Sequence, residues 1–313
     1  MIRAGLSPRH LRATLAAMPM SHPAPFEDFV APARARPQLW RLVLGVGLFV
    51  AVNFAVSAAL FLAVTRALGP EVARPETLGQ SPGMMLLLLF SFAGLALGTW
   101  AAARLLHGRG FLTLIGHGPT ALRHFLAGAG LIAVLYGAGL VLGGWSLGLE
   151  RNLAPGLWLV LLPLALAGIA LQTGAEELAL RGYVQTQLAA RFASPLVWMV
   201  LPSVAFGLLH YDPATMGANA WLVVGVTGLF GLIAADLTAR SGTLGLAWGL
   251  HFANNIFALL VVAPQGPLSG LSLFTAPFGA DDTGTMRGLL VVDVAFLGGV
   301  WALCRLGLNR AAR

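Results

Sequence analysis

Long stretches without a charged residue divide this chain into apolar segments. Seven runs contain no Asp, Glu, Lys or Arg: 42–65, 77–103, 124–149, 152–175, 192–211, 213–235 and 241–280. An eighth, 288–304, is interrupted only by Asp293. A helix needs about 20 apolar residues to cross a bilayer. The longest run contains Pro264 and Pro267, so we expect one span there, near 243–262, followed by a loop. The pattern predicts an all-α polytopic membrane protein with about eight transmembrane helices.

The overall composition excludes an ordinary soluble domain. Of the 313 residues, 58% are hydrophobic and only 10% are charged, whereas soluble domains carry roughly 25% charged residues. A soluble protein of this size would lack the charge to cover its surface. A lipid bilayer is therefore an expected partner of this chain.

The basic residues are all arginines, and they indicate orientation. The net charge is +7, but the arginines stand singly or in the N-terminal tail and form no basic face for nucleic acid. With the N-terminus inside, fifteen arginines fall on the cytoplasmic side and four outside, namely Arg66, Arg74, Arg151 and Arg287. This bias predicts that both termini are cytoplasmic. The lysine-free, Ala-, Gly- and Arg-rich usage is typical of a high-GC bacterium, so we expect a multi-pass protein of the bacterial inner membrane.

The chain is expected to divide into a tail and membrane segments. Residues 1–38 are rich in Pro, Ala and Arg and lack a continuous apolar run, which predicts a disordered cytoplasmic tail. Residues 39–154 hold the first three predicted helices, and 263–313 hold an external loop and the last helix. On the seventh predicted helix, Gly245 and Gly249 have the spacing of closely packed membrane helices.

Two adjacent glutamates near the end of the fourth predicted helix differ in their local partners. Glu177 and Arg181 are spaced i,i+4 with the acid first, the favourable order for a helical ion pair. Glu176 has no such partner and points about 100° away around the helix. Glu176 is therefore a candidate base, and the alternative is that both glutamates simply end a helix at the inner interface.

Three further polar residues lie on the fifth and seventh predicted helices. His210 ends the fifth, and His251 and Asn255 share one face of the seventh at i,i+4 spacing. Each taken alone is more typical of a structural hydrogen bond. Counted from the inner boundaries, however, all of them and Glu176 lie roughly 15–24 Å along their helices at 1.5 Å per residue. We therefore expect a shared polar site between helices four, five and seven.

Two other acids are interpreted as structural. Asp236 and Arg240 repeat the i,i+4 ion pair at the end of the sixth predicted helix. Asp293 has no local partner, and a hydrogen-bonded structural role is favoured for it, with a role in substrate access left open.

The order Glu-Glu-x-x-x-Arg, Phe-x-x-x-His and His-x-x-x-Asn on separate helices resembles the CPBP family of intramembrane proteases, also called the CAAX-protease or Abi family. The resemblance covers residues 155–262 and implies a peptidase core there. It implies that Glu176 activates water, that His210 assists, and that His251 and Asn255 steady the oxyanion. Glu177 and Arg181 complete the first motif. Family members are often labelled metalloproteases, and a zinc ion would use His210, His251 and Glu176. A glutamate-dependent mechanism without bound metal has also been proposed for the family, and the metal-free version is slightly favoured here.

The resemblance implies an intramembrane endopeptidase that hydrolyses a membrane protein or peptide substrate. A secondary transporter also needs buried acids and histidines, but it predicts inverted repeats, and none is visible. A non-catalytic immunity or scaffold protein with the same fold is the other alternative.

Overall fold

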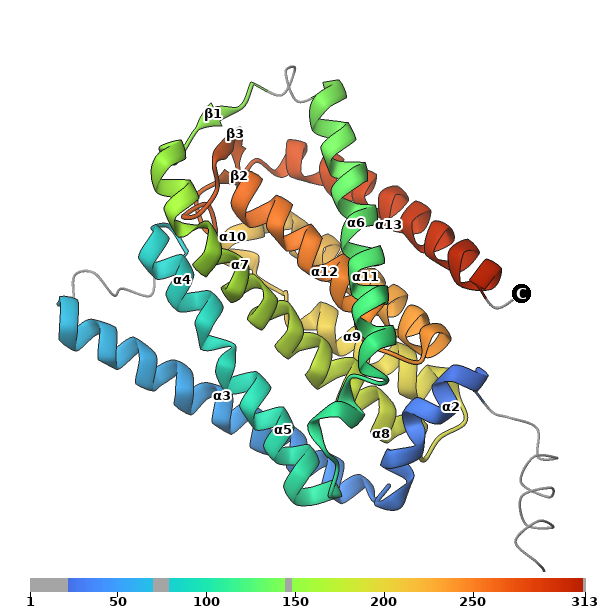
Figure 1. The fold of residues 1–313 in the computed structure, drawn as a ribbon. Helices are drawn as coiled ribbons and strands as arrows, with labels where there is room; N and C mark the ends of the chain where they lie inside the picture. The colour runs from blue at the N-terminus through green and yellow to red at the C-terminus, as the bar shows by residue number, and fades with distance from the viewer. Residues whose placement is uncertain (1–21, 70–78, 144–147, 312–313) are drawn as a thin grey trace, which may run out of the picture.

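Helices dominate the computed structural model, which describes residues 22–69, 79–143 and 148–311 (Figure 1). The N-terminal half contains α2 (Ala24–Val30), η1 (Ala31–Ala35), α3 (Leu39–Leu68), α4 (Pro82–Ser91), α5 (Ala93–His107), η3 (Phe111–Leu114) and α6 (Gly118–Gly143). The central part contains β1 (Glu150–Arg151), α7 (Pro155–Glu177), η5 (Leu178–Gln185), α8 (Thr186–Ala189), η6 (Leu196–Val200), α9 (Leu201–Leu208), α10 (Pro213–Met216) and η7 (Gly217–Asn219). The remainder contains α11 (Ala220–Ser241), α12 (Gly245–Ile256), η8 (Phe257–Val261), β2 (Val262–Gln265), β3 (Phe274–Gly279) and α13 (Thr283–Ala311).

The all-α polytopic class is confirmed, but the count of eight spans is not. Within the described residues, six helices are long and apolar enough to cross a membrane: Leu39–Leu68, Pro82–His107, Gly118–Gly143, Pro155–Ala189, Pro213–Ser241 and Thr283–Ala311. The fifth and seventh predicted spans form the shorter apolar helices Leu196–Leu208 and Gly245–Val261. The first of these rises at most about 20 Å, which is less than the roughly 30 Å hydrocarbon core. The first of these short helices ends just before His210, and the second carries His251 and Asn255.

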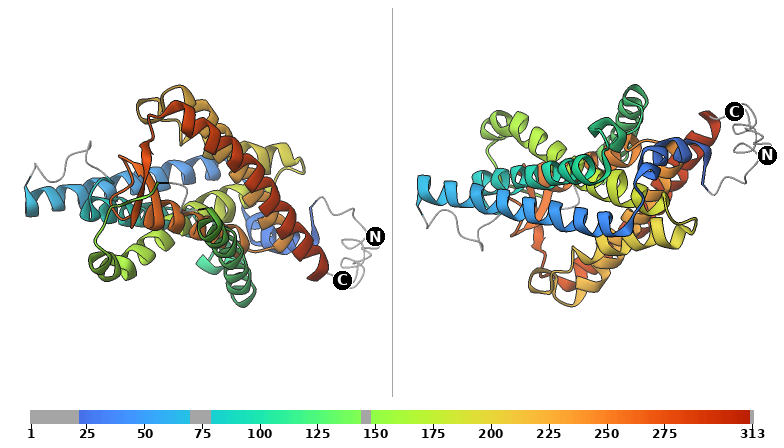
Figure 2. Two further views of the ribbon diagram at one scale, coloured as in Figure 1. Left: turned by 90° about the horizontal axis from the view of Figure 1, so that it is seen from above. Right: turned by 90° about the horizontal axis from the view of Figure 1, so that it is seen from below.

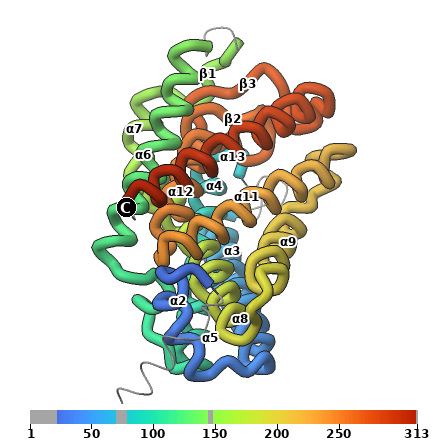
Figure 3. Tube along the Cα trace, turned by 90° about the vertical axis from the view of Figure 1, so that its right-hand side faces the viewer, coloured from blue at the N-terminus to red at the C-terminus, as the bar shows by residue number. Residues whose placement is uncertain are grey.

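Helices α7 and α12 lie side by side in the middle of the bundle (Figure 1). Helix α3 packs along α5, α6 packs along α12, and α11 packs against both α9 and α13. Helix α2 and the end of α13 lie at the same end of the molecule (Figure 2). The short strands lie at the opposite end from α2, α5 and α8 (Figure 3). The chain therefore has two distinct ends, with the apolar helices running between them.

The predicted close packing of Gly245 and Gly249 is confirmed, and the neighbour is α6. A Cβ atom at Gly245 would overlap the backbone oxygen of Ala121, and one at Gly249 would overlap that of Phe125. On the α6 side, a Cβ at Gly128 would lie 2.7 Å from the backbone oxygen of Leu246. Small residues on both helices thus let the two backbones touch. This contact fixes the position of α12 along α6, and with it the position of His251.

The segment after α12 is a small sheet rather than the irregular loop that the sequence predicted. Strand β3 pairs antiparallel with β1 and parallel with β2, in the order β1-β3-β2. Asn152 Nδ2 donates to the backbone oxygens of Ser269 and Ser272, at 2.8 and 2.9 Å, and so ties the loop to the start of α7. Strands β1 and β3 are more than a hundred residues apart in sequence, so no local pattern indicates that they pair.

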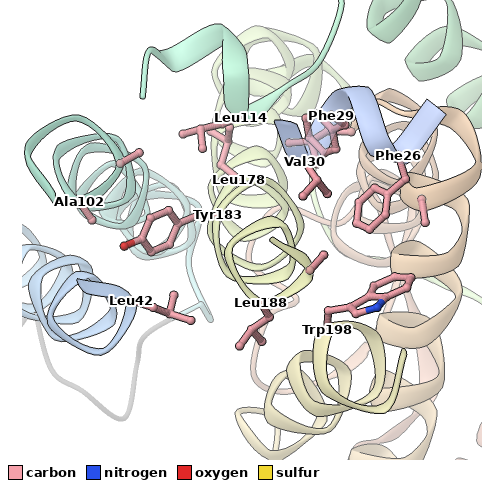
Figure 4. Packing of buried hydrophobic residues seen from close by; sticks show 14 of the residues in the cluster. Phe26, Phe29, Val30, Leu42, Ala102, Leu114, Leu178, Tyr183, Leu188 and Trp198 are labelled. Atoms are coloured by element: carbon pink, nitrogen blue, oxygen red, sulfur yellow. The ribbon is translucent and has the colours of Figure 1, made fainter. Parts of the chain in front are cut away.

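The prediction of a disordered tail over 1–38 is wrong for residues 24–35, and residues 1–21 lie outside the described residues. Helix α2 buries Phe26, Phe29 and Val30 in a cluster that also contains Trp198 (Figure 4). The Phe26 and Trp198 ring centroids are 5.0 Å apart. The segment lacks a continuous apolar run, but three apolar residues at i, i+3 and i+4 share one face. That face is buried because α2 folds back on α11, on α8 and on Trp198 of η6.

A buried arginine fixes the segment that follows the two glutamates. Arg109 is 2% exposed and donates to the Thr186 hydroxyl at 2.8 Å and to the backbone oxygens of Thr113 and Gly182, at 2.8 and 3.2 Å. Burial lowers the pKa of this guanidinium to about 10. The side chain therefore stays charged at neutral pH and fastens η3 to η5.

Candidate active site

The two adjacent glutamates lie where α7 passes into the π-helical segment η5. The backbone here approaches α12 closely, because Gly174 lies against the Trp248 ring, where a Cβ would come within 2.8 Å. Trp248 Nε1 donates to the Thr173 hydroxyl at 3.1 Å. Thr173 and Gly174 therefore bring α7 and α12 together immediately before Glu176 and Glu177.

The predicted ion pair between Glu177 and Arg181 is present and buried. Arg181 Nη1 lies 3.1 Å from Glu177 Oε1, and the two side chains are 3% and 0% exposed. Arg181 Nη2 donates to the backbone oxygen of Gly231 at 3.2 Å, and its guanidinium lies 4.9 Å from the centroid of the Phe206 ring. A buried charge needs a partner, and here each member of the pair supplies it to the other.

His251 lies between the two glutamates, a relationship that the sequence did not reveal. Its Nδ1 is 3.0 Å from Glu177 Oε1, and its Nε2 is 3.5 Å from Glu176 Oε2. A carboxylate accepts hydrogen bonds, so Nδ1 must carry a proton. Glu176 has no helical partner, as expected, but α12 provides it with a tertiary one.

His210 and Asn255 also reach this site, each with one side of its polar group already engaged. His210 Nδ1 donates to the backbone oxygen of Phe206 at 2.9 Å, which leaves Nε2 as the free nitrogen. Asn255 Nδ2 donates to Gln172 Oε1 at 2.8 Å. A primary amide carries two N–H donors, so Asn255 has a second one to offer.

A cavity of about 230 Å³ is lined by all four predicted catalytic residues: Glu176, His210, His251 and Asn255. The sequence-predicted grouping of helices four, five and seven thus corresponds to α7, the end of α9, and α12. Helices α11 and α13 complete the wall. Glu177 and Arg181 are absent from the lining and lie behind it.

Four polar residues of the lining were not assigned to the site by sequence reasoning: Gln172, Thr227, Asn254 and Asp293. Gln172 precedes Glu176 by four residues, so helical spacing could have indicated it. Asn254 adjoins Asn255 but also accepts a hydrogen bond from the Tyr136 hydroxyl at 2.8 Å. Asp293 comes from α13, and no local pattern links that helix to the others.

The arrangement does not fit a zinc ion held by His210, His251 and Glu176. Zinc sites need three or four ligand atoms about 2.0–2.2 Å from one metal. Among the residues that the structure describes, no three His, Cys, Asp or Glu side chains come together closely enough to hold a metal ion. His251 Nδ1 is in addition occupied by Glu177.

Comparison with known proteins finds a family model that matches the central part of the chain. Residues 153–257 match the family described as type II CAAX prenyl endopeptidase, Rce1-like. This match supports the assignment of the segment to the CPBP/CAAX protease family. The matched segment contains Glu176, Glu177, Arg181, His210, His251 and Asn255. It ends before β2, so Asp293 lies outside the part that the family describes.

One curated relative covers much more of the chain. An uncharacterized protein of Bacillus subtilis (strain 168), YyaK, is 27% identical over 271 residues, which is 80% of this chain and 88% of that protein. Its name assigns no activity. No solved structure matches.

Proposed function

We propose that this CPBP/CAAX protease family member is an intramembrane endopeptidase in which Glu176 activates water for peptide hydrolysis. The observation that carries the proposal is the environment of Glu176: its carboxylate borders a polar cavity, and Oε2 lies 3.5 Å from His251 Nε2. Peptide hydrolysis needs a base for the water proton and donors for the developing oxyanion. Both kinds of group border this cavity.

The proposed reaction assigns a separate task to each side chain. Glu176 takes a proton from water, the water oxygen attacks the scissile carbonyl, and the proton then passes to the leaving amine. His210 Nε2 is free to accept a hydrogen bond from the attacking water, because Nδ1 is held by Phe206. The second Asn255 N–H is free to donate to the oxyanion, because Gln172 holds the first.

His251 is better suited to hold the proton near Glu176 than to bind the oxyanion. Its Nδ1 proton is directed at Glu177, and its Nε2 faces Glu176. At 3.5 Å the two atoms are not hydrogen-bonded. Two acceptors facing each other would repel, so a proton on either atom would stabilise the contact. This differs from the role that the family resemblance implies, in which His251 and Asn255 act together on the oxyanion.

We further propose that the substrate is a membrane protein or membrane-associated peptide, and that the protein resides in the bacterial inner membrane with both termini cytoplasmic. Six long apolar helices and the fifteen-to-four arginine bias support this. Helix α2 and the end of α13 lie at one end of the bundle (Figure 2), as two cytoplasmic termini require.

The test compares membranes containing the wild-type chain with membranes containing Glu176→Gln, by mass spectrometry of released peptides. At least one peptide should be released only by the wild type. Asp281→Asn, which changes an exposed carboxylate outside the cavity, is the matched control and should behave as wild type. The same set of peptides from the wild type and Glu176→Gln would contradict the proposal.

A further inference from the structure

Asp293 is a carboxylate within an otherwise uncharged helical stretch, and it borders the same cavity as Glu176. It is the only charged residue in the run 288–304. Ionisable groups inside membrane helices are costly, and they mark functional positions by default. Its helix, α13, lies outside the segment matched by the family.

Contacts of α13 direct this part of the helix toward the site. Phe296, three residues after Asp293, stacks on Tyr136 of α6, with ring centroids 4.9 Å apart and an interplanar angle of 11°. Leu297, four residues after Asp293, lines the cavity as well. Residues three and four apart share a helix face, so the stacking holds Asp293 at the cavity wall.

The cavity has two carboxylates and no arginine or lysine. Glu176 and Asp293 belong to the lining, and the buried cation Arg181 pairs with Glu177 behind it. Within the described part of the chain, no hydrogen bond or ion pair is made by Asp293. His251 is the one histidine in contact with either carboxylate, and it faces Glu176.

The neutral polar groups of the lining are largely occupied with each other. Tyr136 donates to Asn254, Asn254 Nδ2 lies 3.4 Å from Asn255 Oδ1, and Asn255 donates to Gln172. The Nε2 group of Gln172, a side chain only 9% exposed, has no hydrogen-bond partner among the described residues. Gln172 thus offers a buried donor to a ligand carbonyl, whereas Asp293 offers an acceptor that no protein cation satisfies.

We propose that Asp293 is a specificity-determining residue that binds a cationic side chain of the substrate, a guanidinium or an ammonium, beside the scissile bond. This inference rests on the proposed peptidase function and names its substrate class. A bound cation would offset the two carboxylates in a partly buried site, where charge interactions are stronger than in bulk water. A substrate with a neutral side chain at this position would leave Asp293 unpaired, so the site would discriminate against that substrate.

The size of the cavity limits what enters it. Sites for whole drug-sized ligands occupy about 300–1,000 Å³, and this one is about 230 Å³. The space accommodates one long side chain and a water molecule rather than a folded peptide. The cationic residue is therefore expected within one or two positions of the bond that is cleaved.

Binding is measured separately from hydrolysis, in an uncharged maltoside detergent. The probes are two fluorescent, acetylated Ala/Leu peptides that differ only in one central residue, arginine or its neutral isostere citrulline. Both are titrated against Glu176→Gln, which cannot turn them over under the proposed function. We expect the arginine peptide to bind about tenfold more tightly, equal to about 1.4 kcal/mol.

The matched variants decide the assignment. Adding Asp293→Asn to Glu176→Gln should remove the arginine preference, whereas adding Asp281→Asn should keep it. Equal binding of the two peptides to Glu176→Gln, or a preference that survives Asp293→Asn, would overturn the inference. Melting temperatures of all variants in the same detergent confirm that each is folded.

A hydrolysis arm separates this inference from the proposed function. The otherwise wild-type chain should cleave the arginine peptide faster than the citrulline peptide, and Asp293→Arg should instead favour a glutamate peptide. Glu176-dependent cleavage with no charge preference would remove the inference and keep the peptidase. A charge preference in binding with no cleavage of any peptide or membrane protein would keep the binding role of Asp293 and remove the peptidase function.

Discussion

Glu177 accepts a hydrogen bond from His251 Nδ1 at 3.0 Å, across the contact between α7 and α12. The same carboxylate oxygen pairs with Arg181. One oxygen of Glu177 therefore orients the histidine and compensates the arginine. Because Nδ1 is engaged in this way, the other ring nitrogen of His251 is directed to Glu176.

The two adjacent glutamates should respond differently to the same substitution. Glu176→Gln is expected to lower turnover at least about 100-fold, the usual contribution of a general base, while the melting temperature in detergent changes little. Glu177→Gln should lower both turnover and melting temperature, since Arg181 loses its counter-charge. Peptide release and thermal unfolding are measured on the same preparations. Substantial activity in Glu176→Gln beside none in Glu177→Gln would reverse the assignment.

The buried pair should show strong coupling in a double-mutant cycle. Removing one partner of a buried ion pair costs about 3–5 kcal/mol, and removing both costs less. Glu177→Gln with Arg181→Gln should therefore be more stable than either single variant, as judged by unfolding in detergent. The glutamine side chain at 177 retains an oxygen acceptor for His251. Loss of the His251 contact therefore does not explain the expected destabilisation of Glu177→Gln. A double variant as unstable as the sum of the singles would contradict this account.

Close packing of α6 and α12 predicts a clear difference between glycines. Gly245→Ala and Gly249→Ala should each destabilise the protein by about 1–3 kcal/mol, because the added methyl group overlaps the α6 backbone. Gly130 lies on α6 itself and has open space around it, so Gly130→Ala should be neutral or slightly stabilising. Thermal unfolding of the three variants makes the comparison. Equal effects would mean that the helices do not touch at these glycines.

The proposed orientation is checked by reporter fusions after residues 150 and 215, and at the C-terminus. The first two should report an external location and the third a cytoplasmic one, since fifteen of nineteen arginines then lie inside. A cytoplasmic signal at 150 or at 215 would exclude this topology.

Metal removal distinguishes the two chemistries considered for the family. If Glu176 alone activates water, purified protein should keep most of its activity after treatment with a strong chelator. Mock-treated protein carried through the same buffer exchange is the control. Complete loss that zinc restores would instead make His210 and His251 ligands in a conformation different from the one described here.

Local properties of the sequence determine much of this protein. Charge-free runs place the apolar helices, because a helix in lipid needs only its own side chains to be apolar. The i,i+4 spacing determines the Glu177–Arg181 pair, which the structure contains. The same spacing explains why His251 and Asn255 face one cavity. These relationships extend over one or two helical turns, so they can be read directly from the chain.

Only the tertiary structure decided the remaining relationships, because each depends on segments far apart in sequence. His251 meets both glutamates across 74 residues, and Asp293 reaches the cavity from a helix that no motif links to it. Helix α2 is ordered by Trp198 rather than by its own composition. The β-sheet exists because β3 meets β1 and β2. Helix packing sets such contacts, and the apolar pattern of one segment does not specify which distant segment packs against it.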